Sequence, residues 1–293
     1  MPMLLLEGMF SILNAAPDGD SIRFIPHNPM LWKQVRGRVR PNRLGGVQLR
    51  LDAIDSLETH FSVPGVGMRL HQPEYWGNAA ADRLLAFLGF DLQTIQRRLD
   101  KTITGAEPAM LPGYILTRFA DRNGRAIAFA FAGRSPQTLT QPSGTWIQVE
   151  ADWLTASANH DLLATGLAYP TIYSKLYPAL REALILTARQ ARLNQVGLWT
   201  EDVTCQGFQL ESLYTLTHAA VILPKLFRRL ASYWLTETNA LGLAGVQAYL
   251  RAINDRVILP TTGEQTSLDR LLEVKDNWLR LTVQPEDLVF IEK

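Results

Sequence analysis

Three acidic side chains stand close together in the stretch "LRLDAIDSLETH", residues 49–60. They are Asp52, Asp55 and Glu58, and Arg50 comes just before them. Carboxylates at such short spacing can bind a hard divalent cation such as calcium, and an arginine can bind the oxygens of a phosphate. The same pattern also fits the acidic end of an ordinary strand. The stretch alone leaves open whether it is a metal and phosphate site or a solvated strand end.

A second acidic motif, "DGDS" at 18–21, lies between two apolar stretches. Because Asp and Gly favour turns, we predict a hairpin here that carries Asp20 at its exit. Two aspartates and a backbone carbonyl that meet at strand ends would form part of a calcium shell. Taken singly, Asp18 and Asp20 are equally well explained as turn formers.

A basic run separates the two acidic motifs, because no Asp or Glu occurs between Asp20 and Asp52. Within it, "RGRVRPNR" would place Arg36, Arg38 and Arg40 on one face of a strand, where they would meet a polyanionic backbone. The alternative is the solvated face of an irregular segment.

The chain as a whole has the composition of an ordinary globular protein, with 293 residues, 47% hydrophobic and 19% charged. Its length favours two units, and we predict a boundary near residue 203. The single cysteine, Cys205, excludes an internal disulfide and a multi-cysteine zinc site. The apolar N-terminus lacks a basic n-region and predicts a first strand, and no long uncharged apolar stretch predicts a membrane span. We therefore expect a cytoplasmic protein.

Hydrophobic periodicity predicts an α+β fold for the first 200 residues or so, in the form of a small Greek-key barrel capped by helices. Strands are predicted at 7–14, 21–26, 47–54, 113–119 and 126–131, and helices at 78–88, 149–165 and about 173–197. The third strand would place Arg50 and Asp52 on one polar face. For residues 204–293 we expect a mainly helical extension, with apolar helical runs at 210–235 and 240–253 and a strand-like tail at 277–293.

Six short motifs follow one another in an order that is similar to the thermonuclease, or staphylococcal-nuclease-like, family over about residues 8–200. They are "DGDS" (18–21), "RLDAIDSLE" (50–58), "YWGNAA" (75–80), "DRNGRAIAF" (121–129), "GLAY" (166–169) and "GLW" (197–199). The resemblance implies an OB-type five-stranded barrel with helices. It also implies a calcium-dependent endonuclease that hydrolyses phosphodiester bonds in DNA, RNA or both.

The resemblance assigns a role to each of six residues. It implies that calcium is held by Asp20, Asp55 and the backbone carbonyl of Ser56, that the general base is Glu58, and that the phosphate is bound by Arg50 and Arg125. These roles are chemically coherent, because a phosphodiester gains negative charge on attack and forked guanidinium donors stabilise that charge. A carboxylate beside the attacking water can orient or deprotonate it.

The chain departs from the family at four positions, one of which is Ser56 in place of threonine. Leu57 stands where the family usually has proline, and Ile172 and Ser174 stand where it has substrate-contacting tyrosines. Tyr169 or Tyr173 would have to replace those tyrosines by a shift of register, if any base stacking is retained.

Two rival interpretations remain beside the enzyme. One is a catalytically silent module that binds nucleic acid or protein, although the presence of all five charged site residues favours an enzyme. The other makes residues 204–293 a unit that docks a protein partner or self-associates, in which case an apolar patch over 210–253 would be exposed.

Overall fold

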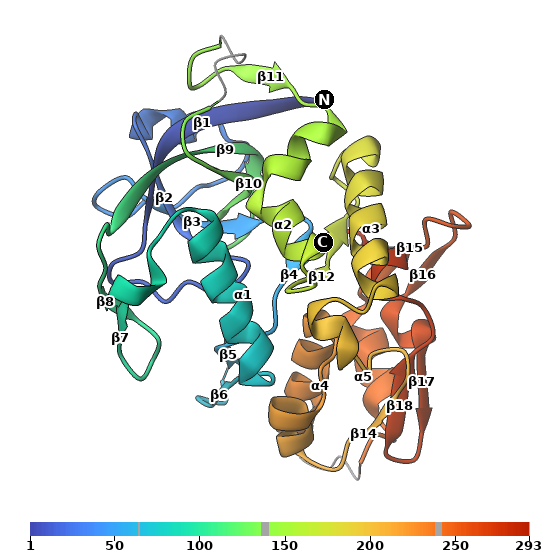
Figure 1. Ribbon diagram of the computed structural model, residues 1–293. Helices are drawn as coiled ribbons and strands as arrows, with labels where there is room; N and C mark the ends of the chain where they lie inside the picture. The colour runs from blue at the N-terminus through green and yellow to red at the C-terminus, as the bar shows by residue number, and fades with distance from the viewer. Residues whose placement is uncertain (64, 136–140, 238–241, 293) are drawn as a thin grey trace. The chain divides into compact units, whose positions relative to one another are not determined.

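The computed structural model describes residues 1–63, 65–135, 141–237 and 242–292 (Figure 1). It forms two compact units: unit 1 contains Met1–Asp52 and Ala80–Leu162, and unit 2 contains Ala53–Ala79 and Leu163–Lys293. Each unit is therefore assembled from separate stretches of the chain. The division of the sequence near residue 203 stays a prediction.

Unit 1 is built on five strands that are hydrogen-bonded in a ring. Its strands are β1 (Pro2–Ser11), β2 (Arg23–Pro26), β3 (Val47–Leu51), β7 (Gln96–Arg97), β8 (Ile103–Gly105), β9 (Met110–Ala120), β10 (Ala126–Ala132) and β11 (Trp146–Gln148). The sheet order is β11-β1-β2-β3-β10-β9, and an additional pairing between β1 and β9 closes the ring. The β3–β10 pair is parallel, whereas the other pairs of the ring are antiparallel. The five strands predicted from the sequence are confirmed, with shifted ends.

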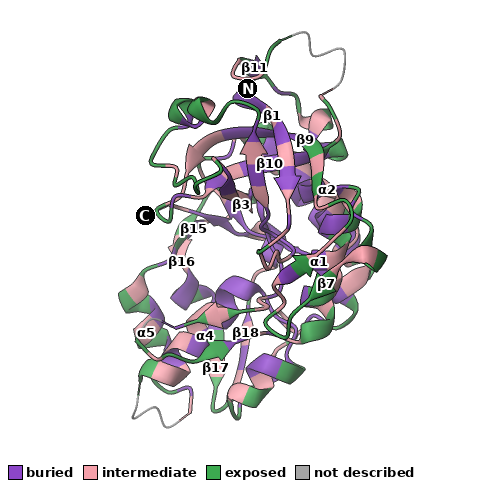
Figure 2. Cartoon of the chain, turned by 90° about the vertical axis from the view of Figure 1, so that its left-hand side faces the viewer, coloured by how far each residue is buried: buried purple, intermediate pink, exposed green. Residues whose placement is uncertain are grey.

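The interior of unit 1 is apolar, and Figure 2 shows buried residues along β1 and β10. Leu4, Leu6 and Phe10 of β1 are fully buried. Phe10 packs across Gly113 of β9, where a Cβ would lie only 2.1 Å from its ring. Glycine is therefore required at this point of close approach between β1 and β9.

The third strand ends earlier than its sequence pattern predicts. β3 stops at Leu51, and Ala53 has a φ of 66°, a left-handed conformation that a residue with a Cβ rarely adopts. The chain therefore leaves the strand direction before it reaches Asp55, which belongs to the short strand β4 (Ile54–Asp55) of unit 2.

Unit 2 contains many short strands. They are β4, β5 (Phe61–Ser62), β6 (Arg69–Leu70), β12 (Tyr169–Pro170), β13 (Ile172–Tyr173), β14 (Phe208–Gln209), β15 (Arg256–Ile258), β16 (Gln265–Ser267), β17 (Leu272–Lys275), β18 (Trp278–Leu281) and β19 (Val289–Phe290). β4 pairs with β12, while the others form the sheets β13-β19-β15-β16, β14-β18-β17 and β5-β6. Figure 1 shows the strands of the C-terminal region in orange to red.

The prediction of a mainly helical extension over 204–293 is wrong, because this region is rich in strands. Of the predicted run 210–235, only α4 (Pro224–Thr236) is an α-helix, preceded by a π-helical turn at Thr215–Ala219. Proline disfavours helix in the residue before it, so α4 begins at Pro224. The second run yields α5 (Val246–Ile253), while residues 240 and 241 lie outside the described residues. The strand-like tail is confirmed by β18 and β19.

The other predicted helices are confirmed, one of them in two pieces. They are α1 (Glu74–Phe87), α2 (Ala158–Ala164) and α3 (Pro178–Leu193). The predicted helix 149–165 is divided into a 3-10 helix at Ala151–Ala156 and α2, because Ser157 between them is extended. The Ser157 hydroxyl accepts a hydrogen bond from His160 N at 3.2 Å, which caps α2.

The apolar residues of α4 and α5 lie in the core of unit 2. Leu226, Phe227 and Leu230 of α4 are fully buried, and Val246 and Leu250 of α5 are almost so. The exposed apolar patch that a docking unit would present over 210–253 is therefore not formed by these side chains. Within the described residues, no helix has the length and apolarity needed to cross a membrane.

Candidate functional site

The residues singled out by the sequence fall into two groups, one in each unit. Unit 1 holds Asp20, Arg50 and Arg125, and unit 2 holds Asp55, Ser56 and Glu58. The structure brings the members of each group together within their own unit.

In unit 1, the loop after β1 is fastened to strand β3. The Asp20 carbonyl accepts a hydrogen bond from Leu51 N at 2.8 Å, and the Asp20 carboxylate lies 3.5 Å from Arg50 Nη1. Gln48 Nε2 donates to Ser21 Oγ at 3.1 Å. The "DGDS" turn is thus placed beside the polar face of β3.

Arg50 and Arg125 lie on one face of the sheet. β3 and β10 pair in parallel with Arg50 opposite Ile127, so these two side chains share a face. Side chains alternate along a strand, and Arg125 precedes Ile127 by two residues, which places it on that same face. The two guanidinium groups therefore belong to neighbouring strands of one surface.

Arg125 is held by the hairpin that joins β9 to β10. Its backbone N and its Nε donate to the Asp121 carboxylate at 2.9 and 2.8 Å. Gly124 supplies the left-handed turn, with a φ of 83°. Among the described residues, the two terminal nitrogens of Arg125 have no acceptor, so they can take one from a ligand.

The basic run adds charge beside this hairpin, but it is not a strand. Its one ladder contact is a single bridge between Arg36 and Phe119, within the part of the chain that the structure describes. Arg40 N donates to the Gly124 carbonyl at 3.0 Å, and the Arg40 side chain packs over Gly124. Arg36, Arg38 and Arg40 are exposed. The strand interpretation is wrong, yet the run still lies next to the residue before Arg125.

In unit 2, Asp55 and Glu58 share one arginine. Arg228 of α4 donates through Nη2 and Nη1 to the two Asp55 carboxylate oxygens, at 2.6 and 3.1 Å. Its Nη1 also lies 2.5 Å from Glu58 Oε1. Asp55 is 1% exposed, and the Arg228 side chain is 21% exposed. The three side chains form a largely buried cluster.

Gln72 fixes the backbone of Glu58. Its own N donates to the Glu58 carbonyl at 2.8 Å, and its side-chain oxygen accepts from Glu58 N at 3.2 Å. Its amide nitrogen donates to the Ile222 carbonyl at 2.8 Å, and the side chain is completely buried. Ser56, two residues before Glu58, is buried as well. The segment 55–58 is thus rigidly held.

Arg228 is the residue that sequence reasoning missed. Burial lowers its pKa, but the carboxylates of Asp55 and Glu58 outweigh burial and hold the pKa well above its usual value, so it stays charged. A signal existed, because Lys225, Arg228 and Arg229 lie among the large apolar residues of one helix, and a charge in such a place needs a partner. The identity of the partners could not be read, because they lie far away in the sequence.

The carboxylates of unit 2 do not fit calcium in this arrangement. Oxygen ligands suit calcium chemically, but both Asp55 oxygens and one Glu58 oxygen already accept hydrogen bonds from a guanidinium. Among the described residues, no group of three or more His, Cys, Asp and Glu side chains is arranged to hold a metal ion.

The tyrosines that could replace the family's substrate-contacting pair are engaged elsewhere. Tyr169 is fully buried, and its hydroxyl donates to the Asp202 carboxylate at 2.6 Å. Burial and the neighbouring Asp202 charge raise the pKa of Tyr169 well above its usual value. Tyr173 packs against Phe290, with ring centres 6.0 Å apart. Tyr169 is therefore a core residue rather than a stacking platform.

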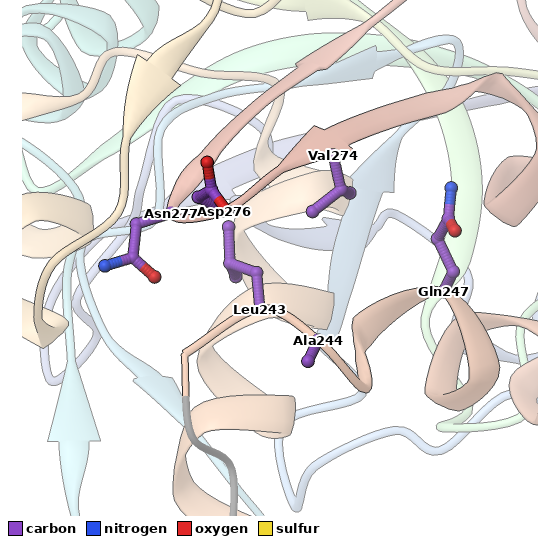
Figure 3. Close-up of a pocket in the computed structure, with 6 residues that line it drawn as sticks. All are labelled: Leu243, Ala244, Gln247, Val274, Asp276 and Asn277. Carbon is purple, nitrogen blue, oxygen red and sulfur yellow. The ribbon is translucent and has the colours of Figure 1, made fainter.

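A pocket on unit 2 involves other residues. It is lined by Leu243, Ala244, Gln247, Val274, Asp276 and Asn277 (Figure 3). The Gln247 amide already donates to the Leu272 carbonyl at 2.9 Å. None of the six lining residues is a predicted site residue, so the pocket adds nothing to the candidate chemistry.

The motifs that resemble the thermonuclease family therefore occupy two distinct settings. "DGDS" and "DRNGRAIAF" border a partly exposed face with two arginines, whereas "RLDAIDSLE" begins on that face in unit 1 and ends in the ion cluster of unit 2. Comparison with known proteins gives no family, because neither a protein-family model nor a curated protein matches the chain.

Proposed function

We propose that the protein is a nucleic-acid phosphodiesterase of the thermonuclease type, an endonuclease that hydrolyses phosphodiester bonds in DNA, RNA or both. The observation that carries this proposal is the parallel register of β3 and β10, which puts Arg50 and Arg125 on one face. The closed ring of five strands supports the finer proposal that unit 1 is an OB-like barrel.

The chemistry of the arginine face suits a phosphodiester. Guanidinium groups are permanently charged and bind phosphate oxygens through two donors at once. Their attraction grows as the phosphate gains negative charge during attack by water, so they lower the barrier as well as binding the substrate. The exposed arginines of the run 36–40 add charge for the flanking backbone.

The roles of the unit 2 residues rest on the family resemblance. In this proposal Glu58 orients or deprotonates water. The resemblance implies Asp20, Asp55 and the Ser56 carbonyl as calcium ligands, but the Asp55 carboxylate is bonded to Arg228 and does not fit the ion in this arrangement. A cytoplasmic location and a partner for residues 204–293 likewise stay predictions.

A cleavage assay with labelled single-stranded and double-stranded DNA and RNA, in calcium or in chelator, tests the proposal. Arg125→Ala removes a donor to the developing charge, so we expect its cleavage rate to fall about 100-fold or more. Arg97→Ala is the matched control, because Arg97 is also an ion-paired arginine of unit 1 and lies on β7, outside the ring. It should cleave like the original protein. Absence of cleavage under every condition, or equal rates for both variants, would contradict the proposal.

One observation favours a second candidate, a module that binds nucleic acid without cleaving it. Arg228 already satisfies Asp55 and Glu58, the two carboxylates that catalysis would need. Such a module would bind labelled DNA with an affinity that falls steeply with salt, and Arg125→Ala would weaken binding. Binding without cleavage in calcium, magnesium or manganese would decide for this candidate.

A further inference from the structure

The Asp55 and Glu58 carboxylates make the contacts that are typical of a cation site. Here the cation is the guanidinium group of Arg228, a side chain of the protein itself. Three oxygen atoms, two from Asp55 and one from Glu58, lie between 2.5 and 3.1 Å from the two terminal nitrogens of Arg228. The guanidinium plane and the Asp55 carboxylate form a bidentate pair, the strongest common geometry between these groups. Arg228 thus takes the oxygen atoms that a metal ion would otherwise use.

Burial makes this pairing necessary. Asp55 is 1% exposed and the Glu58 side chain 18%, and a buried carboxylate without a positive partner is costly. The fold supplies the partner on α4, whose neighbouring Leu226, Phe227 and Leu230 are fixed in the core of unit 2. The position of Arg228 is therefore set by the packing of the helix, not only by its charge.

The charges around the cluster are balanced without an added ion. Asp55 and Glu58 face Arg228, while the nearby Asp255 faces Arg229 at 2.6 Å and Lys225 at 3.9 Å. In these ion pairs of the described residues, three acids face three bases. A divalent ion placed at Asp55 would add two positive charges beside a guanidinium that cannot lose its proton.

We infer that Arg228 is an internal cation that excludes a divalent metal ion from Asp55 and Glu58. The inference rests on the proposed function only in naming these carboxylates as part of the hydrolytic site; the contacts themselves are independent of it. If the protein is a nuclease, Arg228 holds this part of the site in a metal-free form.

Calcium-dependent stability, measured by thermal unfolding of the full chain without nucleic acid, tests the inference. The original protein should unfold at the same temperature in calcium and in chelator. Arg228→Gln should be less stable in chelator but should regain about 3–5 °C at a calcium concentration ten times its dissociation constant. The double variant Arg228→Gln, Asp55→Asn should lose that calcium response.

Two further variants make the result specific. Arg229→Gln is the matched control, because it frees a different acid, Asp255, which Lys225 still faces; it should show no calcium response. Arg228→Lys keeps a positive charge but lacks the two parallel donors of a guanidinium group. Its unfolding temperature should rise less with calcium than that of Arg228→Gln. It also serves as the folded variant if Arg228→Gln does not fold.

Two outcomes would overturn the inference. One is a rise in the unfolding temperature of the original protein in calcium that Asp55→Asn abolishes. This result would show that calcium binds in spite of Arg228. The other is an unfolding temperature that does not change with calcium in any Arg228 variant that folds. Failure of the proposed function is distinguishable, because it would appear as absent DNA and RNA cleavage and leaves these unfolding measurements unchanged.

Discussion

The two units hold their acids and arginines in different ways. In unit 1, Arg50 approaches Asp20 through a contact of 3.5 Å, with side chains 15% and 12% exposed. In unit 2, Arg228 grips Asp55 through two contacts of 2.6 and 3.1 Å, and the Asp55 side chain is 1% exposed. A single contact of 3.5 Å can be exchanged for a ligand more easily than a short two-point pair whose carboxylate is 1% exposed. The difference separates a face suited to binding from a cluster suited to holding the fold.

The largest effect is expected from removing the buried arginine. Arg228→Ala leaves Asp55 and Glu58 without their cation, so we expect the free energy of unfolding to fall by about 3–5 kcal/mol. Denaturant titration measures this loss. Arg280→Ala is the control, because Arg280 and Glu273 form a pair at 2.8 Å whose side chains are 43% and 48% exposed; its loss should stay below about 1 kcal/mol. Equal losses for the two variants would remove the contrast between buried and exposed pairs.

A neutral side chain, Asn159, stabilises unit 1, whereas an ion pair stabilises unit 2. The fully buried Asn159 donates to the Asp52 and Ala128 carbonyls at 2.8 and 3.1 Å, and accepts from Ala130 N at 3.1 Å. Asn159→Ala leaves these backbone groups without the hydrogen bonds that Asn159 makes. The free energy of unfolding should therefore fall by about 2–3 kcal/mol.

The loss of unfolding free energy in Asn159→Ala should be the same at low and at high salt, because the side-chain amide of Asn159 is neutral. A salt-dependent loss measured by denaturant titration would show that charge, not hydrogen bonding, fastens α2 to β3 and β10.

A smaller effect should appear in the pH dependence of unit 2. Burial lowers the pKa of Lys225 from 10.5 to about 8, against the attraction of Asp255, which raises it. Above pH 8 the folded protein has released this proton, while the unfolded chain keeps it up to about pH 10.5. Unfolding then takes up a proton, so this group makes the protein more stable as the pH rises through that window.

The comparison with Lys225→Met isolates this contribution. Between pH 7 and pH 9.5 the original protein should gain about 2 kcal/mol of unfolding free energy relative to the variant. Parallel pH profiles for the two proteins would show that Lys225 titrates in the folded state as it does in the unfolded chain.

Local rules predicted the parts of the fold that depend on neighbours in the sequence. The Asp-Gly-Asp turn, the alternation of β3 and the hairpin before Arg125 follow from turn chemistry and strand periodicity, and the structure contains all three. They set the positions of Arg50 on β3 and of Arg125 before β10, but the pairing of the two strands that brings both arginines to one face is a long-range contact. The sequence pattern was sufficient there because each feature is decided within a few residues.

The rest depended on contacts between distant segments. Strands of three or four residues, such as β15 and β16, are too short to show a period, so the strands between residues 256 and 275 were not predicted. The left-handed Ala53 has no signal in its residue type. Arg228 could be suspected of needing a partner, but only the fold of unit 2 identifies Asp55 and Glu58.

The discontinuous make-up of unit 2 has a consequence for the order of events during synthesis. Glu58 precedes Arg228 by 170 residues, and ribosomes add about 5–20 residues per second, so the acid waits roughly ten to thirty seconds for its partner. During that interval residues 80–162 of unit 1 are completed first. The segment 53–79 can form its own β5–β6 pair early, but its apolar Leu57 and Leu70 stay exposed to water on the growing chain until residues 163–293 supply the rest of their core.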